Sequence, residues 1–572
     1  MKGIKSYIPI LQWLPNYKKE QLNGDLFAGL TVGIMLIPQG MAYALIAGLP
    51  PVYGLYASIV PQIIYAILGT SRQLSVAPVA MDSLLVASGV SVLAMEGTDA
   101  YISFAILLAF FMGVSQFLLG TFKLGFITNL LSKPVISGFT SAAALIIGLN
   151  QLKYLIGVDI AKSNRVYEIV ANAFSKLDQT HLVTLVIGIG GIVLIKGVKK
   201  INGKIPGALL AVVFGTLIVY FMGLDTQGVS IVKEIPEGLP AFKMPDFSLG
   251  QFEELIPLAL TISVVAFMEA FSVAKALEAK KRNYKVIPNQ ELLALGASNI
   301  VGSLFQSYPV TGGFSRSAVN FQAGANTPLS SIISAVLVGL TLIFLTPLFY
   351  HLPHAILASV IMVAIVGLID VSYVRYLWKK DKLEFTLLAV TFLVTLNFSM
   401  VPGIVSGIVF SILILMYRAA YPHVALLGKV KETSEFRNLS RFEDLKTWEE
   451  LLIIRIDAPY AFINIQTIKE RIVKEADLRK GSLKYVILDA SSVSYVDATA
   501  IDGLKELIIE LKELDVQLVM SSVLGPVRDS FHKNGIFEEM NGNMFLNSDE
   551  AVKALIGEQV DFYPEHVNQV NK

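Results

Sequence analysis

Only 16% of the 572 residues in this chain are charged and 54% are hydrophobic, whereas a soluble protein carries about 25% charged residues, so much of the surface must face lipid. The formal net charge of +1 is not the balance of a nucleic-acid-binding protein. The chain has no cysteine, which excludes disulfides and thiolate metal sites, and its six histidines lack metal-ligand spacing. With no nucleotide-binding loop either, we expect neither an enzyme nor a bound metal or other cofactor.

Apolar runs of roughly 17–25 residues indicate membrane-spanning helices. In chain order, the runs of the first half lie near 26–47, 52–69, 76–94, 102–122, 133–151, 181–198 and 206–223. Those of the second half lie near 253–275, 288–306, 311–325, 328–350, 354–370, 383–400 and 403–420. An odd number of spans per half inverts the second half relative to the first, so residues 1–430 are predicted to form an all-α membrane domain with a 7+7 inverted repeat.

The positions of lysine and arginine predict the orientation in the membrane, because basic loops accumulate on the cytoplasmic side. With the N-terminus inside, the basic loops 196–204, 275–285 and 375–382 all fall on that side. The N-terminal segment lacks the apolar core and cleavage site of a signal peptide, so the first span is expected to stay in the protein. We predict a multi-pass protein of the cell's plasma (inner) membrane with both termini in the cytoplasm.

Two of the spans are interrupted at matching places in the two halves, at residues 74–83 and 308–317. Short segments broken by proline or glycine in corresponding halves are typical of the binding site of a secondary transporter. A helix that begins at mid-membrane presents unpaired N–H groups and a partial positive charge, which favour an anion. Pro78 suits a first helical turn, and Arg316 adds a cation at the second break. The alternative is that these residues only kink packed helices.

Other spans carry polar side chains that extend this candidate site. Gln39 lies between Pro38 and Gly40 in the first span, and Tyr43 is on the same helical face. An amide can donate to an anion, although it can also bond a carbonyl that a kink has freed.

Two acids also lie inside predicted spans. Glu269 has Lys275 as its nearest cation in sequence, and Asp82 follows Pro78 by about one turn. A carboxylate in the membrane interior can exchange protons or coordinate a cation. The alternatives are an ion pair of Glu269 with Lys275 or Arg316, and compensation of a helix dipole by Asp82.

After about residue 430 charged residues become frequent and the apolar runs shorten. Residues 451–456, 485–488 and 516–520 read as buried strands, and residues 499–514 have apolar positions at helical spacing. This alternation predicts a cytosolic α/β domain over residues 431–572.

Several of these segments resemble the sulfate permease (SulP) family of anion transporters. The matching motifs of the membrane domain are residues 25–58, 69–80, 289–299 and 311–320. Residues 455–464 and 489–503 resemble the STAS domain that follows SulP membrane domains. The resemblance implies two inverted repeats divided into a core and a gate domain, with the anion held between the N-termini of the third and tenth segments. It also implies a homodimer.

The resemblance assigns roles to individual residues. The positions that match the family's substrate site are Gln39, Tyr43, Val79, Gly313 and Phe314, followed by Ser315 and Arg316. Glu269 matches an acid linked to proton coupling in sulfate carriers, whereas Asp82 matches no position of the general pattern. Thr499 falls where related signalling proteins carry a phosphorylated serine, although Asp497 or Thr499 can equally cap the helix that follows.

We therefore expect a proton-coupled symporter of an inorganic anion, sulfate first, that works by alternating access. One alternative is a sodium-coupled transporter of bicarbonate or a dicarboxylate. An alternative from another class is a membrane-anchored regulator whose working part is the STAS domain.

Overall fold

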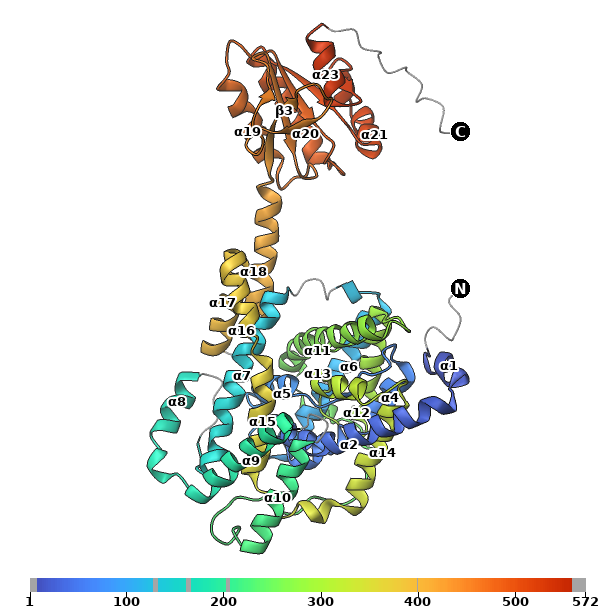
Figure 1. Cartoon of the computed structure of the whole chain (residues 1–572), viewed down its shortest axis with the longest axis vertical. Coiled ribbons are helices and arrows are strands. Elements are labelled where there is room, and N and C mark those ends of the chain that lie inside the picture. The colour runs from blue at the N-terminus through green and yellow to red at the C-terminus, as the bar shows by residue number, and fades with distance from the viewer. Residues whose placement is uncertain are drawn as a thin grey trace. The chain divides into compact units, whose positions relative to one another are not determined.

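The computed structural model describes residues 8–126, 132–160, 166–201, 206–250, 252–398 and 400–557. The chain divides into two compact units, Met1–Ser411 and Ile412–Lys572 (Figure 1).

The first unit consists of helices that follow the predicted spans in order. Its first half contains α2 (Lys19–Ile46), α3 (Pro51–Tyr56), α4 (Val60–Leu68), α5 (Ala80–Val90), α6 (Asp99–Thr121), α7 (Lys133–Ile156), α9 (Leu182–Ile201) and α10 (Gly207–Met222). Its second half contains α11 (Phe252–Lys281), α12 (Pro288–Ser303), α13 (Phe314–Gln322), α14 (Leu329–Phe344), α15 (His354–Ile365), α16 (Val371–Lys380), α17 (Lys382–Asn397) and the start of α18 (Met400–Ala420). In the described residues, eight helical stretches are long and apolar enough to cross a membrane. The predicted all-α membrane fold is confirmed.

The helices depart from the predicted spans in three places. The second span is two helices, α3 and α4, each with a proline in its first turn, because proline fits the start of a helix but not its interior. The span predicted near 354–370 ends early, and the amphipathic helix α16 follows it. A short helix, α8 (Val166–Phe174), lies in a connection where none is predicted.

The packing of these helices repeats with the two halves exchanged. Helix α2 packs against α14, and their counterparts α11 and α6 pack against each other. The contact of α6 with α12 corresponds in the same way to that of α14 with α4, and the contact of α7 with α17 corresponds to that of α15 with α9. An internal repeat produces this correspondence, because each contact between two helices is matched by a contact between their two counterparts.

The same contacts separate two bundles within the first unit. The core bundle is formed by the first four and the eighth to eleventh segments, from α2 to α6 and from α11 to α14. The gate bundle contains α7, α9, α10, α15 and α17. Figure 1 shows α11, α12, α13 and α6 gathered beside α2, with α7, α9 and α15 on the other side. The predicted division into core and gate is thus visible in the packing.

Glycines permit close helix contacts in the core bundle. A Cβ placed on Gly296 of α12 would lie 2.5 Å from the backbone nitrogen of Phe117 on α6. Small residues at such positions let two helix backbones approach closely, which favours van der Waals packing between helices in a membrane.

The second unit is an α/β domain, as predicted. Its main strands are β3 (Val424–Val430), β4 (Phe436–Asn438), β6 (Leu451–Ile456), β7 (Tyr485–Asp489), β8 (Gln517–Ser521) and β9 (Met544–Phe545). The sheet order is β4-β3-β6-β7-β8-β9, with β5 (Leu445–Lys446) paired to β3. Strands β6 to β9 run parallel, and β3 is antiparallel to β6.

Both faces of this sheet are covered by apolar side chains. Leu452, Ile454 and Ile456 of β6 join a core with α19 (Ile465–Asp477) and α20 (Ala498–Glu513). The intervening Leu451 and Ile453 join a second core with α23 (Ser548–Leu555). A strand buried on both faces reads as a continuous apolar run, which explains why the sequence pattern located β6 correctly.

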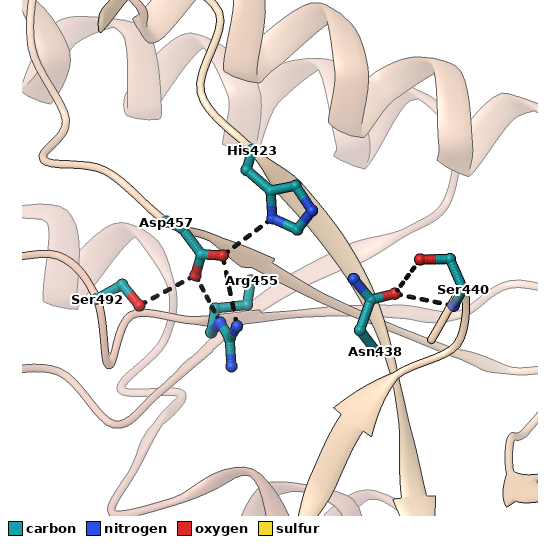
Figure 2. A network of polar contacts seen from close by, with 6 residues as sticks. All are labelled: His423, Asn438, Ser440, Arg455, Asp457 and Ser492. Atoms are coloured by element: carbon teal, nitrogen blue, oxygen red, sulfur yellow. Dashed lines mark hydrogen bonds and ion pairs between the residues drawn. The ribbon is translucent and has the colours of Figure 1, made fainter. Parts of the chain in front are cut away.

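A polar cluster joins β3 and β6 at the start of the second unit (Figure 2). Asp457 accepts a hydrogen bond of 2.7 Å from Nε of Arg455 and one of 3.2 Å from Oγ of Ser492. Nδ1 of His423 lies 3.0 Å from its other oxygen. Partial burial acts to raise the pKa of Asp457, but the bonds from Arg455 and His423 outweigh it and hold this pKa below its ordinary value.

Candidate functional site

The two sequence breaks meet as a small antiparallel sheet in the core bundle. Strand β1 (Val76–Ala77) pairs with β2 (Thr311–Gly312), with Val76 opposite Gly312 and Ala77 opposite Thr311. Helix α5 begins directly after Val79, and α13 begins directly after Gly313. With 11 and nine residues and a rise of about 1.5 Å per residue, each helix covers only about half of a bilayer core.

The first turns of these two half-helices keep free backbone donors. In both helices the earliest backbone bond comes from the fourth residue after the cap, from Ser83 N to Val79 O and from Ser317 N to Gly313 O. Neither cap residue provides a side-chain hydrogen bond to its own helix. Free N–H groups together with the positive ends of two helix dipoles make a place that favours an anion.

Cross-bonds between the breaks fix the two half-helices relative to each other. The Gly313 N–H donates to the Ser75 carbonyl at 3.0 Å, and the Ser75 N–H donates to Oγ of Ser317 at 2.9 Å. Nη2 of Arg316 donates to the carbonyl of Ala77 at 3.1 Å. Each break therefore holds the other in place.

Neighbouring helices anchor the second break through residues that sequence reasoning missed. Asn299 of α12 accepts a bond of 2.9 Å from Val310 N and donates one of 3.0 Å to Val310 O. Oγ1 of Thr311 donates to the carbonyl of Ala266 on α11 at 2.7 Å. Asn299 lies within the motif 289–299 and is polar inside an apolar helix, which is the only signal for it in the sequence.

Two buried carboxylates hold the far ends of the breaks. Glu291 of α12 accepts bonds of 2.7 Å and 2.5 Å from the N–H and hydroxyl of Thr70, ahead of β1, and one of 2.5 Å from the Tyr65 hydroxyl. Asp25 of α2 accepts bonds of 3.0 Å and 2.7 Å from the N–H and hydroxyl of Thr327, after α13. These carboxylates are satisfied, so their role is structural.

The predicted residues of the first span lie beside the breaks. Helix α2 packs against both α5 and α13. Gln39 and Tyr43 are both buried, and Oε1 of Gln39 has no hydrogen-bond partner in the described residues. Tyr43 lies near enough to Arg316 and Glu269 to interact with both charges.

The glycine at the second break leaves room for the Arg316 guanidinium. Val79 and Arg316 are buried, and Arg316 is only 2% exposed. A Cβ on Gly313 would lie 2.7 Å from Nη2 of Arg316 and 3.2 Å from Cγ1 of Val79. Nε of Arg316 is buried and has no partner among the residues that the structure describes.

Two of the predicted site residues differ from the rest in exposure. The side chain of Phe314 is 64% exposed, and Ser315 is exposed as well. Their backbone N–H groups belong to the first turn of α13. Phe314 and Ser315 can therefore contribute backbone N–H groups to the site, whereas their side chains are not enclosed in it.

Both intramembrane acids lie at the site. Glu269 on α11 interacts with the charge of Arg316, and Asp82 on α5 interacts with Glu269. Lys275 is instead paired with Glu278 at 2.6 Å. Glu269 forms no ion pair with any described residue, and Arg316 acts on it only through a longer-range electrostatic interaction.

The residues around Thr499 show how the following helix begins. The cap of α20 is Asp497, whose Oδ1 accepts a bond of 2.8 Å from Ala500 N and whose Oδ2 accepts one of 2.8 Å from Phe462 N. Thr499 itself is exposed. Capping explains Asp497, and phosphorylation of Thr499 stays a prediction.

Comparisons with known proteins agree with this geometry. Residues 22–391 match the model of the sulfate permease family, and residues 444–551 match that of the STAS domain. Sulfate transporter 4.1, chloroplastic, from Arabidopsis thaliana is 38% identical over 95% of this chain and 81% of its own length. High affinity sulfate transporter 2 from Stylosanthes hamata is 34% identical over 96% of this chain and 86% of its own length. The inward-facing structure of the murine Solute Carrier 26 family member A9 anion transporter is similar with a TM-score of 0.90 at 27% identity, covering 97% of this chain and 96% of that chain.

Proposed function

The chain belongs to the sulfate permease family, and we propose that it is a secondary transporter that carries sulfate together with protons. The observation that carries this proposal is the pair of half-helices, which start from one two-stranded sheet and point uncapped N-termini at a shared place beside a buried arginine. Sulfate is chosen because both relatives named above are sulfate transporters. The family is one of transporters, not enzymes.

The anion would be bound mainly by backbone groups. First-turn N–H groups of α5 and α13 would donate to the sulfate oxygens, and Arg316 would offset part of the charge. The full set of proposed substrate residues is Gln39, Tyr43, Val79, Gly313, Phe314, Ser315 and Arg316. Such a site consists of partial charges and one cation, Arg316, that already donates to the Ala77 carbonyl. We expect it to bind sulfate weakly enough to release it, which a carrier requires.

Glu269 is the proposed coupling residue. It interacts electrostatically with Arg316 without forming an ion pair, and its Oε2 is buried with no partner among the described residues. An ionised carboxylate that is buried without a hydrogen bond is costly, and binding a proton removes that cost. When a sulfate dianion arrives beside Glu269, repulsion between the two negative charges favours proton uptake at Glu269. Proton and anion therefore bind to the core together.

Transport would proceed by alternating access, in which the core bundle moves against the gate bundle. The bonds that join the breaks, such as those of Asn299 and Glu291, lie within the core bundle. The site can therefore travel as one rigid piece.

We infer the domain limits, location and assembly as follows. The proposed limits are residues 1–430 for the transport domain and 431–572 for the STAS domain, with strand β3 (Val424–Val430), just ahead of that limit, joining the STAS sheet. The protein acts as a homodimer in the plasma (inner) membrane, with both termini in the cytoplasm. The family membership supports a multi-pass membrane protein, and the basic loops near 196–204, 275–285 and 375–382 support cytoplasmic termini. Membrane fractionation and chemical cross-linking test them, and recovery in an organelle membrane or as a monomer would contradict them.

Uptake of labelled sulfate into proteoliposomes tests the proposed function. An inward proton gradient should drive accumulation, and an equal sodium gradient at fixed pH should not. Glu269→Gln should remove the acid stimulation, whereas Glu254→Gln, which changes an exposed acid on the same helix, should keep it. Sodium-driven uptake, or preference for bicarbonate or a dicarboxylate over sulfate, would overturn the proposal.

A further inference from the structure

The carboxyl group of Asp82 is buried and makes no hydrogen bond with any described residue. Asp82 is 0% exposed, and neither of its oxygens accepts a hydrogen bond from any described residue. An aspartate that caps a helix accepts the free N–H groups of the first turn. Asp82 accepts none, although it lies in the first turn of α5. Capping therefore does not account for this buried acid.

The groups that face Asp82 include a second unsatisfied acid. Glu269 approaches it from α11, which packs against α5, and Tyr308 approaches it from the second break. The Tyr308 hydroxyl lies 3.2 Å from Oγ of Ser83, the residue next to Asp82. Arg316 interacts with Glu269, Tyr43 and Tyr308. The site therefore contains one positively charged side chain, Arg316, and two carboxyl groups.

Counting charges shows that this site needs more than one proton when sulfate is bound. With both acids ionised, the charges of Arg316, Asp82, Glu269 and a sulfate dianion sum to about −3 in a protein interior where each uncompensated charge is costly. Like charges close together disfavour ionisation of both. With a proton on each carboxyl group the sum falls to about −1, a negative charge that the positive ends of the two helix dipoles favour.

We propose that Asp82 binds a second transported proton, so that two protons accompany each sulfate ion. One proton resides on Glu269 and one on Asp82. The two positive charges of the protons cancel the two negative charges of the sulfate dianion, so transport moves no net charge across the membrane. This inference rests on the proposed function and adds the stoichiometry and a second coupling residue to it.

The ratio of internal to external sulfate concentration at zero net flux (the sulfate ratio) measures the number of coupled protons. In proteoliposomes clamped at zero membrane potential, each coupled proton multiplies the sulfate ratio by about tenfold per pH unit. The wild-type protein should hold a ratio of about 100-fold across one pH unit. Asp82→Asn and Asp82→Ser should each hold only about tenfold, and Asp82→Glu should restore about 100-fold.

Matched controls separate this inference from the proposed function. Asp99→Asn, which changes an exposed acid at the start of α6, should keep the wild-type ratio. Sulfate counterflow without a pH gradient shows that each Asp82 variant folds and binds its substrate. A wild-type ratio of about tenfold, or an unchanged ratio in both neutral Asp82 variants, would overturn the role of Asp82 and leave proton-coupled sulfate transport standing. A ratio that follows sodium instead of pH would overturn both.

Discussion

Substitution of Gly313 by alanine is the sharpest single perturbation of the site. Gly313 caps α13 with φ of −82°, which alanine adopts without strain, so the effect comes from contacts alone. The new Cβ would lie 2.7 Å from Nη2 and 2.9 Å from Cζ of Arg316. Both distances are too short, so the guanidinium must move away from its bond to the Ala77 carbonyl.

The size of the effect follows from that bond. A hydrogen bond to a charged group contributes about 1.5–3 kcal/mol, and each 1.36 kcal/mol is about a tenfold change in an equilibrium constant. If the displaced Arg316 no longer offsets the charge of the anion, the KM for sulfate should rise by about 10- to 150-fold. The fold should persist, because the guanidinium is the far end of a flexible side chain.

Initial rates of sulfate uptake over a range of sulfate concentrations measure this change. The matched control is Gly190→Ala in α9, where a Cβ meets no described atom within 4 Å. Its KM should equal that of the wild-type protein. The thermal unfolding temperature of each purified variant reports on folding. A folded Gly313→Ala protein with the wild-type KM would refute the placement of the anion beside Arg316.

Three further substitutions test hydrogen bonds that are expected to stabilise the membrane unit and the STAS unit. Glu291→Gln should lower the thermal unfolding temperature and the uptake rate, because at least one buried donor loses its acceptor at a cost of about 1–3 kcal/mol; an unchanged melting curve would show that Glu291 does not hold the first break. Asp497→Ala should destabilise the STAS unit by about 1–2 kcal/mol, as loss of a helix cap does. Denaturant unfolding followed by far-UV circular dichroism measures this change. Equal unfolding midpoints for the variant and the wild-type protein would rule out a capping role for Asp497. Because bonds from Arg455 and His423 hold the pKa of Asp457 below its ordinary value, its stabilisation is present above about pH 4 and is lost as pH falls through the folded-state pKa. Asp457→Asn should therefore lower the unfolding temperature near neutral pH and weaken its dependence on acid, and parallel pH curves for the two proteins would contradict this.

The sequence predicted the order of the spans well because long apolar runs have few alternatives in a membrane protein. Strand β6 was equally clear, since a parallel strand buried on both faces is apolar throughout. The division of the second span into α3 and α4 was missed because both helices are apolar and only their first-turn prolines mark the break. Helix α8 was missed because nine residues in a connection give a weak periodic signal.

The sequence allowed the two breaks of the candidate site to be predicted, but not the residues of other helices that anchor them. Proline and glycine in matching places pointed to the third and tenth segments without any knowledge of their pairing. The roles of Asn299 and Thr311 depend on contacts with other helices, so no local pattern contains them. The exposure of Phe314 is likewise a property of the packed bundle. The pairing of Arg316 with the Ala77 carbonyl joins residues in opposite halves of the domain, and only the fold brings them together.

The position of the bound anion tests the central claim most directly. An electron cryo-microscopy map of the purified protein in saturating sulfate, compared with a map in sulfate-free buffer, would locate it. We predict added density between the caps Val79 and Gly313, within hydrogen-bond distance of first-turn N–H groups of both α5 and α13. Density at any other place in the core bundle, with this place empty in a preparation that transports sulfate, would contradict the account.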